Sequence, residues 1–148
     1  MTLLTHRGAG PGFQYAGQPM HIPAGHDGRP AGLAAMEITI PPLFAGPIPH
    51  AHDEFDEAIY ILAGQLQVTG DGPPQEARAG SMFTAARGSR HGFSNPYPEP
   101  ALVLGIWAPA EPGLAFMRDI GAALSPSAPP DPDAMREIYA RHASRLLP

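Results

Sequence analysis

The sequence predicts an all-β barrel or sandwich that ends in a short helical tail. Short apolar runs alternate with turn residues over most of the chain, which contains 17 Gly and 20 Pro among 148 residues. Such spacing is typical of many short strands joined by tight turns. Helical spacing occurs only toward the C-terminal end. We therefore expect one domain over residues 1–148, with a barrel core at about 33–108 and a helical tail at about 112–147.

The N-terminal third contains two strand patterns. Residues 13–22 predict one short strand in a Gly-rich region. Residues 33–40 alternate more clearly, and they place Met36, Ile38 and Ile40 on one face of a strand. We expect this face to point toward the core.

The middle of the chain contains the longest apolar runs. Residues 56–63 are nearly continuously apolar and predict a strand that is buried on both faces. Gly64 follows as a turn, and residues 65–69 alternate as the half-exposed hairpin partner of that strand. Residues 75–95 predict two further short strands, and residues 101–107 another buried one.

The tail predicts two helices. Residues 112–124 have apolar positions at helical spacing. Asp131 is typical of an N-cap and Pro132 of the first position of a second helix. One face of this second helix is marked by Met135, Ile138, His142 and Leu146.

The composition excludes several kinds of chemistry. The chain contains no Cys and no Lys, which excludes disulfides, thiolate ligands, Schiff bases and a Walker-type phosphate loop. The net charge is −5 and no basic stripe is present, so we expect no nucleic-acid partner. No apolar run approaches ~18 residues and the N-terminus lacks a signal-peptide pattern, so we expect a cytoplasmic protein without a membrane partner.

One acidic and His-rich segment carries the candidate chemistry. His50 and His52 are separated by one residue, so on a strand they point to the same face. Metal coordination compensates the cost of burying such a pair. Glu57 begins the buried strand and is the expected carboxylate, with Glu54 as the alternative if the strand register shifts. His91 is a fourth candidate ligand.

The spacing of these residues resembles the first motif of the cupin superfamily. That motif reads His-x-His, three or four residues, Glu, six residues, Gly, and it is matched by His50, His52, Glu57 and Gly64. The opening Gly of the motif would fall at Phe44, and Gly46 lies two residues later.

The second cupin motif is matched by Gly80, Gly88, His91 and Asn95, whereas its Pro would fall at Ala86. The order of elements along the whole chain is similar to that of small single-domain cupins of the quercetin-dioxygenase-like kind. The resemblance implies a cupin jelly-roll barrel (a double-stranded β-helix).

The resemblance also implies that His50, His52, Glu57 and His91 hold one divalent transition metal, which could be Fe, Mn, Ni, Co, Cu or Zn. The first hypothesis is a dioxygenase acting on a small aromatic or enolisable substrate, with Glu57 as ligand and catalytic base. The alternatives are a non-redox cyclase, isomerase or lyase, and a metal- or small-molecule-binding cupin without turnover.

The expected substrate pocket contains Phe93, Tyr60, Phe44 and Arg90. Phe93 shares a strand face with His91 and is the best candidate for a pocket wall. Arg90 either grips an anionic or enolate substrate or forms a rim salt bridge. We also expect a homodimer, because small cupins commonly pair through N-terminal strands that otherwise leave an open sheet edge.

Overall fold

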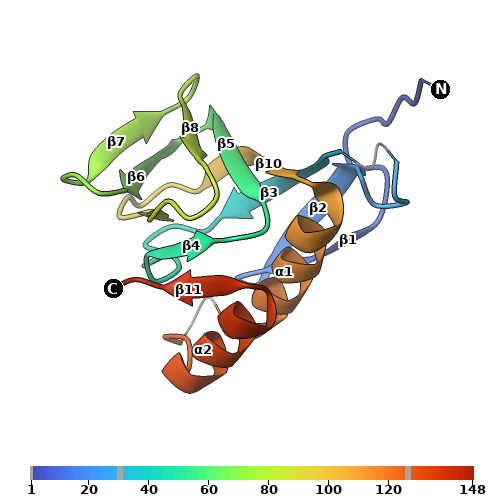
Figure 1. Ribbon diagram of the computed structural model, residues 1–148. Helices are drawn as coiled ribbons and strands as arrows, with labels where there is room; N and C mark the ends of the chain where they lie inside the picture. Colours follow the sequence, from blue (N-terminus) through green and yellow to red (C-terminus); the bar gives the residue numbers. More distant parts are fainter. Residues whose placement is uncertain (1, 30–31, 126–127) are drawn as a thin grey trace.

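The protein is a barrel of short antiparallel strands with two helices packed on one side of it (Figure 1). The computed structural model describes residues 2–29, 32–125 and 128–148. The strands are β1 (Gly12–Tyr15), β2 (Gln18–Ala24), β3 (Ala34–Ile40), β4 (His50–His52), β5 (Asp56–Ala63), β6 (Gln65–Thr69), β7 (Gln75–Arg78), β8 (Met82–Ala85), β9 (Gly92–Ser94), β10 (Ala101–Ala108) and β11 (Ser144–Leu146). The helices are α1 (Ala110–Ala123) and α2 (Pro132–Arg141).

The strands form one large sheet and two small ones. The large sheet has the order β1-β2-β3-β10-β5-β8, and the small sheets are β7-β6-β9 and β4-β11. All pairings of named strands are antiparallel, and the non-consecutive neighbours are those of a jelly roll. The all-β class with helices at the C-terminal end is confirmed. Strand β1 is an edge of the large sheet. A homodimer that pairs through this edge stays a prediction.

The alternation of β3 fixes the inner face of the large sheet. Met36 and Ile40 are 0% exposed and Ile38 is 3% exposed, as the sequence predicted. The neighbouring strand β10 buries every second residue in the same way. These side chains make up much of the single apolar core.

Strand β5 is buried on one face only, which corrects the prediction of burial on both. Glu57, Ile59 and Ile61 point inward, whereas Tyr60 and Leu62 are exposed. An antiparallel sheet can leave one face in water, and exposed apolar side chains on that face make the sequence look continuously apolar.

Strand β6 does not pair with β5, contrary to the predicted hairpin. Gly64 has φ +76°, and a Cβ there would lie 2.7 Å from the carbonyl oxygen of Pro100. The chain passes at this glycine from the large sheet to the small one, where β6 pairs with β7 and β9. The small sheet explains why residues 75–95 contain three strands rather than the expected two.

The predicted single strand at residues 13–22 is a hairpin. Ala16 and Gly17 have φ values of +48° and +74°, and they form the turn between β1 and β2. Two consecutive positive φ values are typical of the turns that join adjacent antiparallel strands. The sequence pattern missed this turn because Ala16 has no turn preference of its own.

The second helix begins as predicted and ends earlier. The Asp131 side chain accepts a hydrogen bond from the Asp133 N–H at 3.0 Å, which confirms the N-cap. The helix ends at Arg141, and Ala143, with φ +47°, turns the chain into β11. Leu146 therefore lies on a strand and not on the helix. Within the described residues, no helix is long and apolar enough to cross a membrane.

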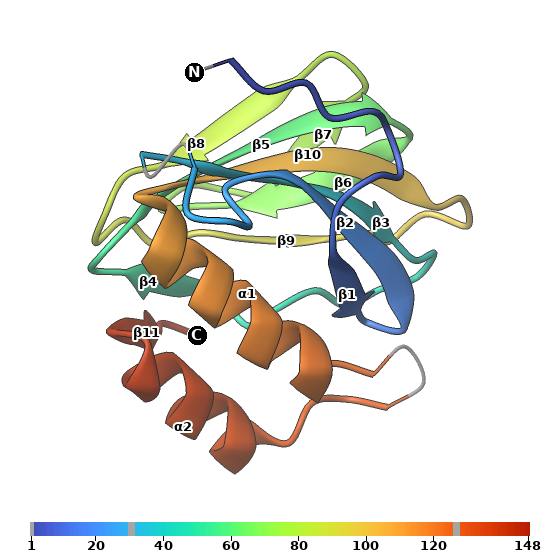
Figure 2. The same ribbon diagram turned by 90° about the vertical axis from the view of Figure 1, so that its right-hand side faces the viewer.

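The C-terminal tail lies against the strand that carries the two neighbouring histidines. Both helices lie on the same side of the barrel in Figure 2, and β11 follows α2 back toward the strands. In the β11–β4 pair, Ser144 is opposite His52 and Leu146 is opposite His50. The tail therefore closes the barrel next to the candidate ligands.

Trp107 occupies a slot that two glycines leave open. A Cβ on Gly105 would lie 2.1 Å from the Trp107 ring, and a Cβ on Gly113 would lie 2.3 Å from the Trp107 Cβ. These distances are far below any real contact, so the indole can only lie there because both positions lack a side chain. Trp107 is 1% exposed.

We predict that Gly105→Ala destabilises the protein by about 1–3 kcal/mol, because the added methyl group forces the buried indole to move. Urea unfolding followed by Trp fluorescence measures this. Gly72→Ala is the matched control, since a Cβ at Gly72 meets nothing within 4 Å and should change stability by less than about 0.5 kcal/mol. Equal stabilities for the two variants would contradict the steric argument.

Candidate metal centre

Three imidazoles meet inside the barrel. His50 and His52 come from β4, and both are buried on the same face of that strand. His91 precedes β9 and forms a bridge with His50, in which each backbone N–H donates to the other residue's carbonyl at 2.8 Å. One ring nitrogen from each of the three residues lies within 4.8 Å of the others. The predicted same-face pair and its partner His91 are thus brought together.

Two of these imidazoles are oriented by backbone carbonyls. The Nδ1–H of His50 donates to the Ile48 carbonyl at 2.8 Å, and the Nδ1–H of His91 donates to the Ser89 carbonyl at 2.9 Å. A proton on Nδ1 leaves the Nε2 lone pair free. This is the usual way in which the protein around a metal site fixes the tautomer of a His ligand.

The third imidazole is oriented by the C-terminal strand. The Ser144 hydroxyl donates to the His142 carbonyl at 3.0 Å, so its oxygen accepts from the His52 Nδ1–H at 2.7 Å. The two bonded residues are 92 positions apart in the sequence. His52 therefore also presents an unprotonated Nε2 to the centre.

The Nε2 atoms of His52 and His91 are buried and have no hydrogen-bond partner among the described residues. An unpaired buried acceptor is unfavourable, and a metal ion is the partner that three converging lone pairs fit. Burial, together with the neighbouring imidazoles, lowers the pKa of His50 to about 3 and that of His52 to about 2. Both rings are neutral near pH 7, which is the state that binds metal.

Glu57 lies beside the imidazoles. Its Oε2 is 3.7 Å from the His52 Nε2, and its Oε1 is 3.7 Å from the His91 Nε2. Trp107 donates its indole N–H to Oε2 at 2.8 Å. Burial raises the pKa of the Glu57 carboxyl, while His91 and the Trp107 hydrogen bond act in the opposite direction. Glu54, the alternative from the sequence, is exposed.

A small cavity adjoins His50 and Glu57. Its volume is ≈ 20 Å³, which is room for about one water molecule. Most of its wall is aliphatic or aromatic and comes from the large sheet and α1, and Trp107, Tyr15 and Tyr139 are the other lining residues with a polar side-chain group. Burial raises the pKa of both phenols, and the nearby Glu57 carboxylate adds to this effect for each. Tyr139 raises the pKa of Tyr15 as well.

The predicted pocket residues separate in the structure. Phe93 lines the cavity, as expected. Tyr60 is 36% exposed on the outer face of β5, because it is an odd number of residues from Glu57 along the strand. Phe44 packs against Tyr15 with ring centroids 6.2 Å apart and does not line the cavity.

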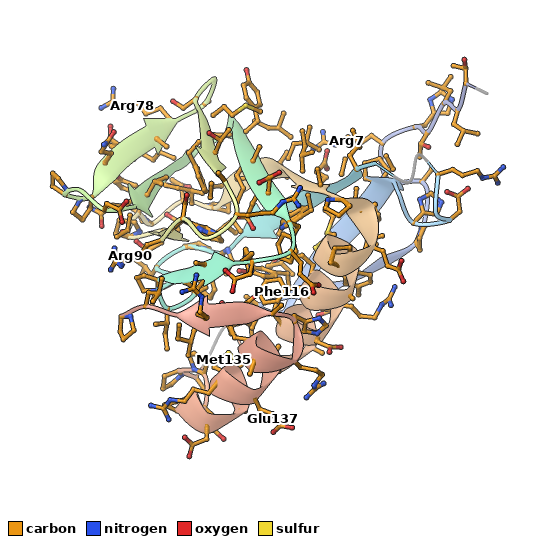
Figure 3. The ribbon with its side chains drawn as sticks, in the orientation of Figure 1. Arg7, Arg78, Arg90, Phe116, Met135 and Glu137 are labelled. Atoms are coloured by element: carbon orange, nitrogen blue, oxygen red, sulfur yellow. The ribbon has the colours of Figure 1, made fainter. Side chains whose placement is uncertain are left out.

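Arg90 has a structural role instead of the predicted place in the cavity. Its guanidinium donates to the Gly70 carbonyl at 2.6 Å and to the Leu147 carbonyl at 2.9 Å, which ties the C-terminal end to the small sheet. It lines a separate groove of ≈ 410 Å³ between that sheet and β8, which extends to His91. Figure 3 shows Arg90 near the outside of the molecule, whereas Phe116 lies between α1 and the strands.

Two motif positions support the loops around the site. Asn95 is 0% exposed, and its side-chain amide donates to the carbonyls of Pro41 and Glu99 at 3.0 and 2.8 Å. Gly46 has φ +82°, and a Cβ there would overlap the Phe93 carbonyl oxygen at 1.6 Å. Gly46 thus allows the close approach of two loops, although it lies two residues after the motif's position.

Sequence reasoning missed several residues that support the centre. Phe116 of α1 and Tyr139 of α2 contact His52 and His50, with ring centroids 4.6 and 5.0 Å apart. The helical spacing marked their helices, but nothing in it said which part of the barrel the helices cover. Trp107 and Ser144 likewise carry no local signal, because their partners Glu57 and His52 are distant in the sequence.

Comparisons with known proteins agree with this architecture. Residues 36–107 match the family model of the cupin domain. KdgF from Halomonas sp. superposes with a TM-score of 0.56 at 23% identity, over 66% of this chain and 85% of that one. An RmlC-like cupin from Shewanella frigidimarina gives 0.56 at 21% identity, over 67% and 82% of the two chains.

A sugar phosphate isomerase of the cupin superfamily from Silicibacter pomeroyi gives a TM-score of 0.55 at 22% identity, over 62% of this chain and 59% of that one. Identities this low show the shared fold alone. No curated protein matches the chain by sequence. The match of residues 36–107 and the shared jelly-roll fold agree with a cupin-like barrel, inside which the three histidines lie.

Proposed function

We propose that the protein is a metal-dependent enzyme with one divalent metal held by His50, His52 and His91, and with Glu57 as the fourth ligand. The observation that carries this proposal is the pair of buried Nε2 atoms without partners, directed at the same point as a third imidazole. The rings are held in the correct tautomer before any metal arrives, which lowers the cost of binding.

Three nitrogen ligands and one oxygen ligand suit Fe, Mn, Ni, Co, Cu and Zn. Such a metal supplies a Lewis acid with open coordination positions and, when it is redox-active, a route for electrons to O₂. The protein's own contribution is to exclude bulk water and to hold Glu57 in place. The indole N–H of Trp107 is fixed on Oε2 at 2.8 Å, so Oε1 is the freer atom for accepting a substrate proton.

The cavity wall favours a substrate with an apolar body. Among the described residues, no Arg lines the cavity, and Glu57 is its sole acidic residue. Apart from the proposed metal, a phosphate or carboxylate would have no cationic side chain to bind there. We propose a dioxygenase that acts on a small aromatic or enolisable compound, for which an apolar, water-poor cavity also suits O₂.

A second candidate is a non-redox isomerase, cyclase or lyase. The observation that favours it is the arrangement of Glu57, with one oxygen fixed by Trp107 and the other free, as a base for moving a proton needs. Both candidates use the same residues. Consumption of O₂ separates them.

We predict that His52→Ala lowers the bound metal from near one equivalent to below about 0.1 equivalent, because one of three nitrogen ligands is lost. Elemental analysis of protein purified without chelator or added metal measures this. His26→Ala is the matched control, since His26 is exposed and outside the cluster. Full metal content in the His52 variant, with its β-type circular dichroism retained, would contradict the ligand assignment.

We predict O₂ uptake when the metal-loaded protein is given quercetin or a small catechol. Glu57→Gln should reduce that uptake by about 100-fold or more through loss of the base, while the three histidines still bind metal. The exposed neighbour provides the control variant Glu54→Gln, which should behave as wild type. Stoichiometric Zn without O₂ uptake would overturn the dioxygenase and leave the isomerase, cyclase or lyase.

We predict that the metal-free protein loses stability as the pH falls from 7.5 to 5.0. The unfolded chain protonates His50 and His52 near pH 6.5, whereas the folded pKa values are about 3 and about 2. The unfolded state thus binds more protons between these values, which costs about 2 kcal/mol for each imidazole at pH 5.

Urea unfolding at the two pH values measures this loss. The variant His52→Gln isolates the contribution of that residue, because its pH dependence should be smaller than that of wild type by the share of one imidazole. An identical pH dependence in the two proteins would show that His52 is not held neutral in the fold.

A further inference from the structure

The cavity beside Glu57 is lined by two Tyr residues whose hydroxyls the metal centre does not use. Tyr15 of β1 and Tyr139 of α2 are 3% and 2% exposed, and both line the cavity. Within residues 2–29, 32–125 and 128–148, neither hydroxyl forms a hydrogen bond, and neither oxygen is among the fully buried atoms without a partner. Each hydroxyl therefore keeps some accessible surface, where a molecule in the cavity can meet it.

Packing alone does not account for these hydroxyls. The Tyr15 ring packs against Phe44, and the Tyr139 ring packs against Phe116 with ring centroids 5.2 Å apart. A Phe at either position would make the same ring contacts without burying a polar atom. A hydroxyl without a partner in the protein that faces a cavity is satisfied by water or by a ligand oxygen, which points to a partner from outside the chain.

We propose that Tyr15 and Tyr139 bind the oxygen of the substrate, which is a small neutral molecule with an apolar body and a carbonyl, enol or phenol group. This inference rests on the proposed function, because it takes the cavity beside His50 and Glu57 as the place of reaction. The hydroxyls come from the barrel and from the C-terminal tail, and the aliphatic and aromatic wall contacts the rest of the molecule.

Access to the cavity depends on the element that carries Tyr139. At ≈ 20 Å³ the cavity is closed to anything much larger than water. Helix α2 packs on the core through Met135, Ile138 and Tyr139, and it supplies one wall of the cavity. A ligand larger than water has to move part of this wall in order to reach the Tyr139 hydroxyl.

The test compares catechol with benzene, a ring of the same size without oxygen. Isothermal titration gives the Kd of each for wild type, Tyr15→Phe and Tyr139→Phe, in Zn-loaded and in metal-free form. We expect each substitution to weaken catechol binding by about 3- to 10-fold, the worth of one hydrogen bond, and to leave benzene binding within about 2-fold. Tyr60→Phe is the control, because that hydroxyl is on the outer face of β5.

Thermal unfolding of the metal-free variants separates a binding role from a structural one. Removing a hydroxyl that has no partner in the fold should leave the melting temperature unchanged or raise it, whereas removing a structural hydrogen bond lowers it. A lowered melting temperature, unchanged catechol affinity, equal losses for benzene, or no catechol binding by wild type would each overturn the proposal. An effect of only one substitution would overturn it for the pair.

Elemental analysis of the same samples tests the proposed function independently of the catechol comparison. If elemental analysis shows that wild type takes up no metal, the enzyme assignment fails. The catechol comparison with metal-free protein still decides whether the two hydroxyls bind a ligand oxygen.

Discussion

The structure depends on keeping three imidazoles and a carboxylate buried at one point inside an apolar barrel. Burying each of these polar groups costs free energy. The fold orients them with hydrogen bonds to the ring and carboxylate atoms that point away from the centre. The Ile48 and Ser89 carbonyls and the Ser144 hydroxyl bind the three Nδ1–H groups, and the Trp107 indole binds Glu57. The inner nitrogen atoms are left for a ligand.

This constraint extends from the centre to the periphery through Trp107. The indole reaches Glu57 because Gly105 and Gly113 leave space for it. One of these glycines is in β10 and the other is in α1, so the strand-to-helix connection is shaped around a single side chain. The packing of α1 on the barrel and the position of the Glu57 carboxylate therefore both depend on the position of the Trp107 side chain.

The sequence predicted those parts of the site that depend on local spacing. His50 and His52 share a face because side chains on a strand alternate with a period of two. The same rule places Glu57 and Tyr60 on opposite faces of β5, but the continuous apolar run hid this alternation in the sequence. The all-β class and the helical tail followed from short alternating runs and from the N-cap at Asp131, whereas the jelly roll was implied by the resemblance of the two motifs to cupins. The passage of the chain between sheets at Gly64 could not be predicted, because one turn residue is compatible with either a hairpin or a crossover.

Contacts between distant segments were beyond the sequence. Ser144 orients His52 from 92 residues away, and no pattern in a three-residue strand marks such a partner. Arg90 adjoins His91 and was a candidate for either a substrate-binding cation or a rim salt bridge, yet its Nε and Nη1 donate to the carbonyls of Leu147 and Gly70. The position of a residue in the sequence does not predict the hydrogen-bond partners of a side chain as long as Arg.

The C-terminal tail contacts both the cavity and the candidate metal centre. Strand β11 pairs with β4 and supplies the hydroxyl that fixes the His52 tautomer, and α2, just before it, supplies the Tyr139 ring against His50. Moving this tail outward would open the cavity and would also release the Nδ1–H of His52. A metal bound to the Nε2 of His52 would therefore favour the closed tail, and the closed tail would favour metal binding to the same extent, since such coupling is reciprocal.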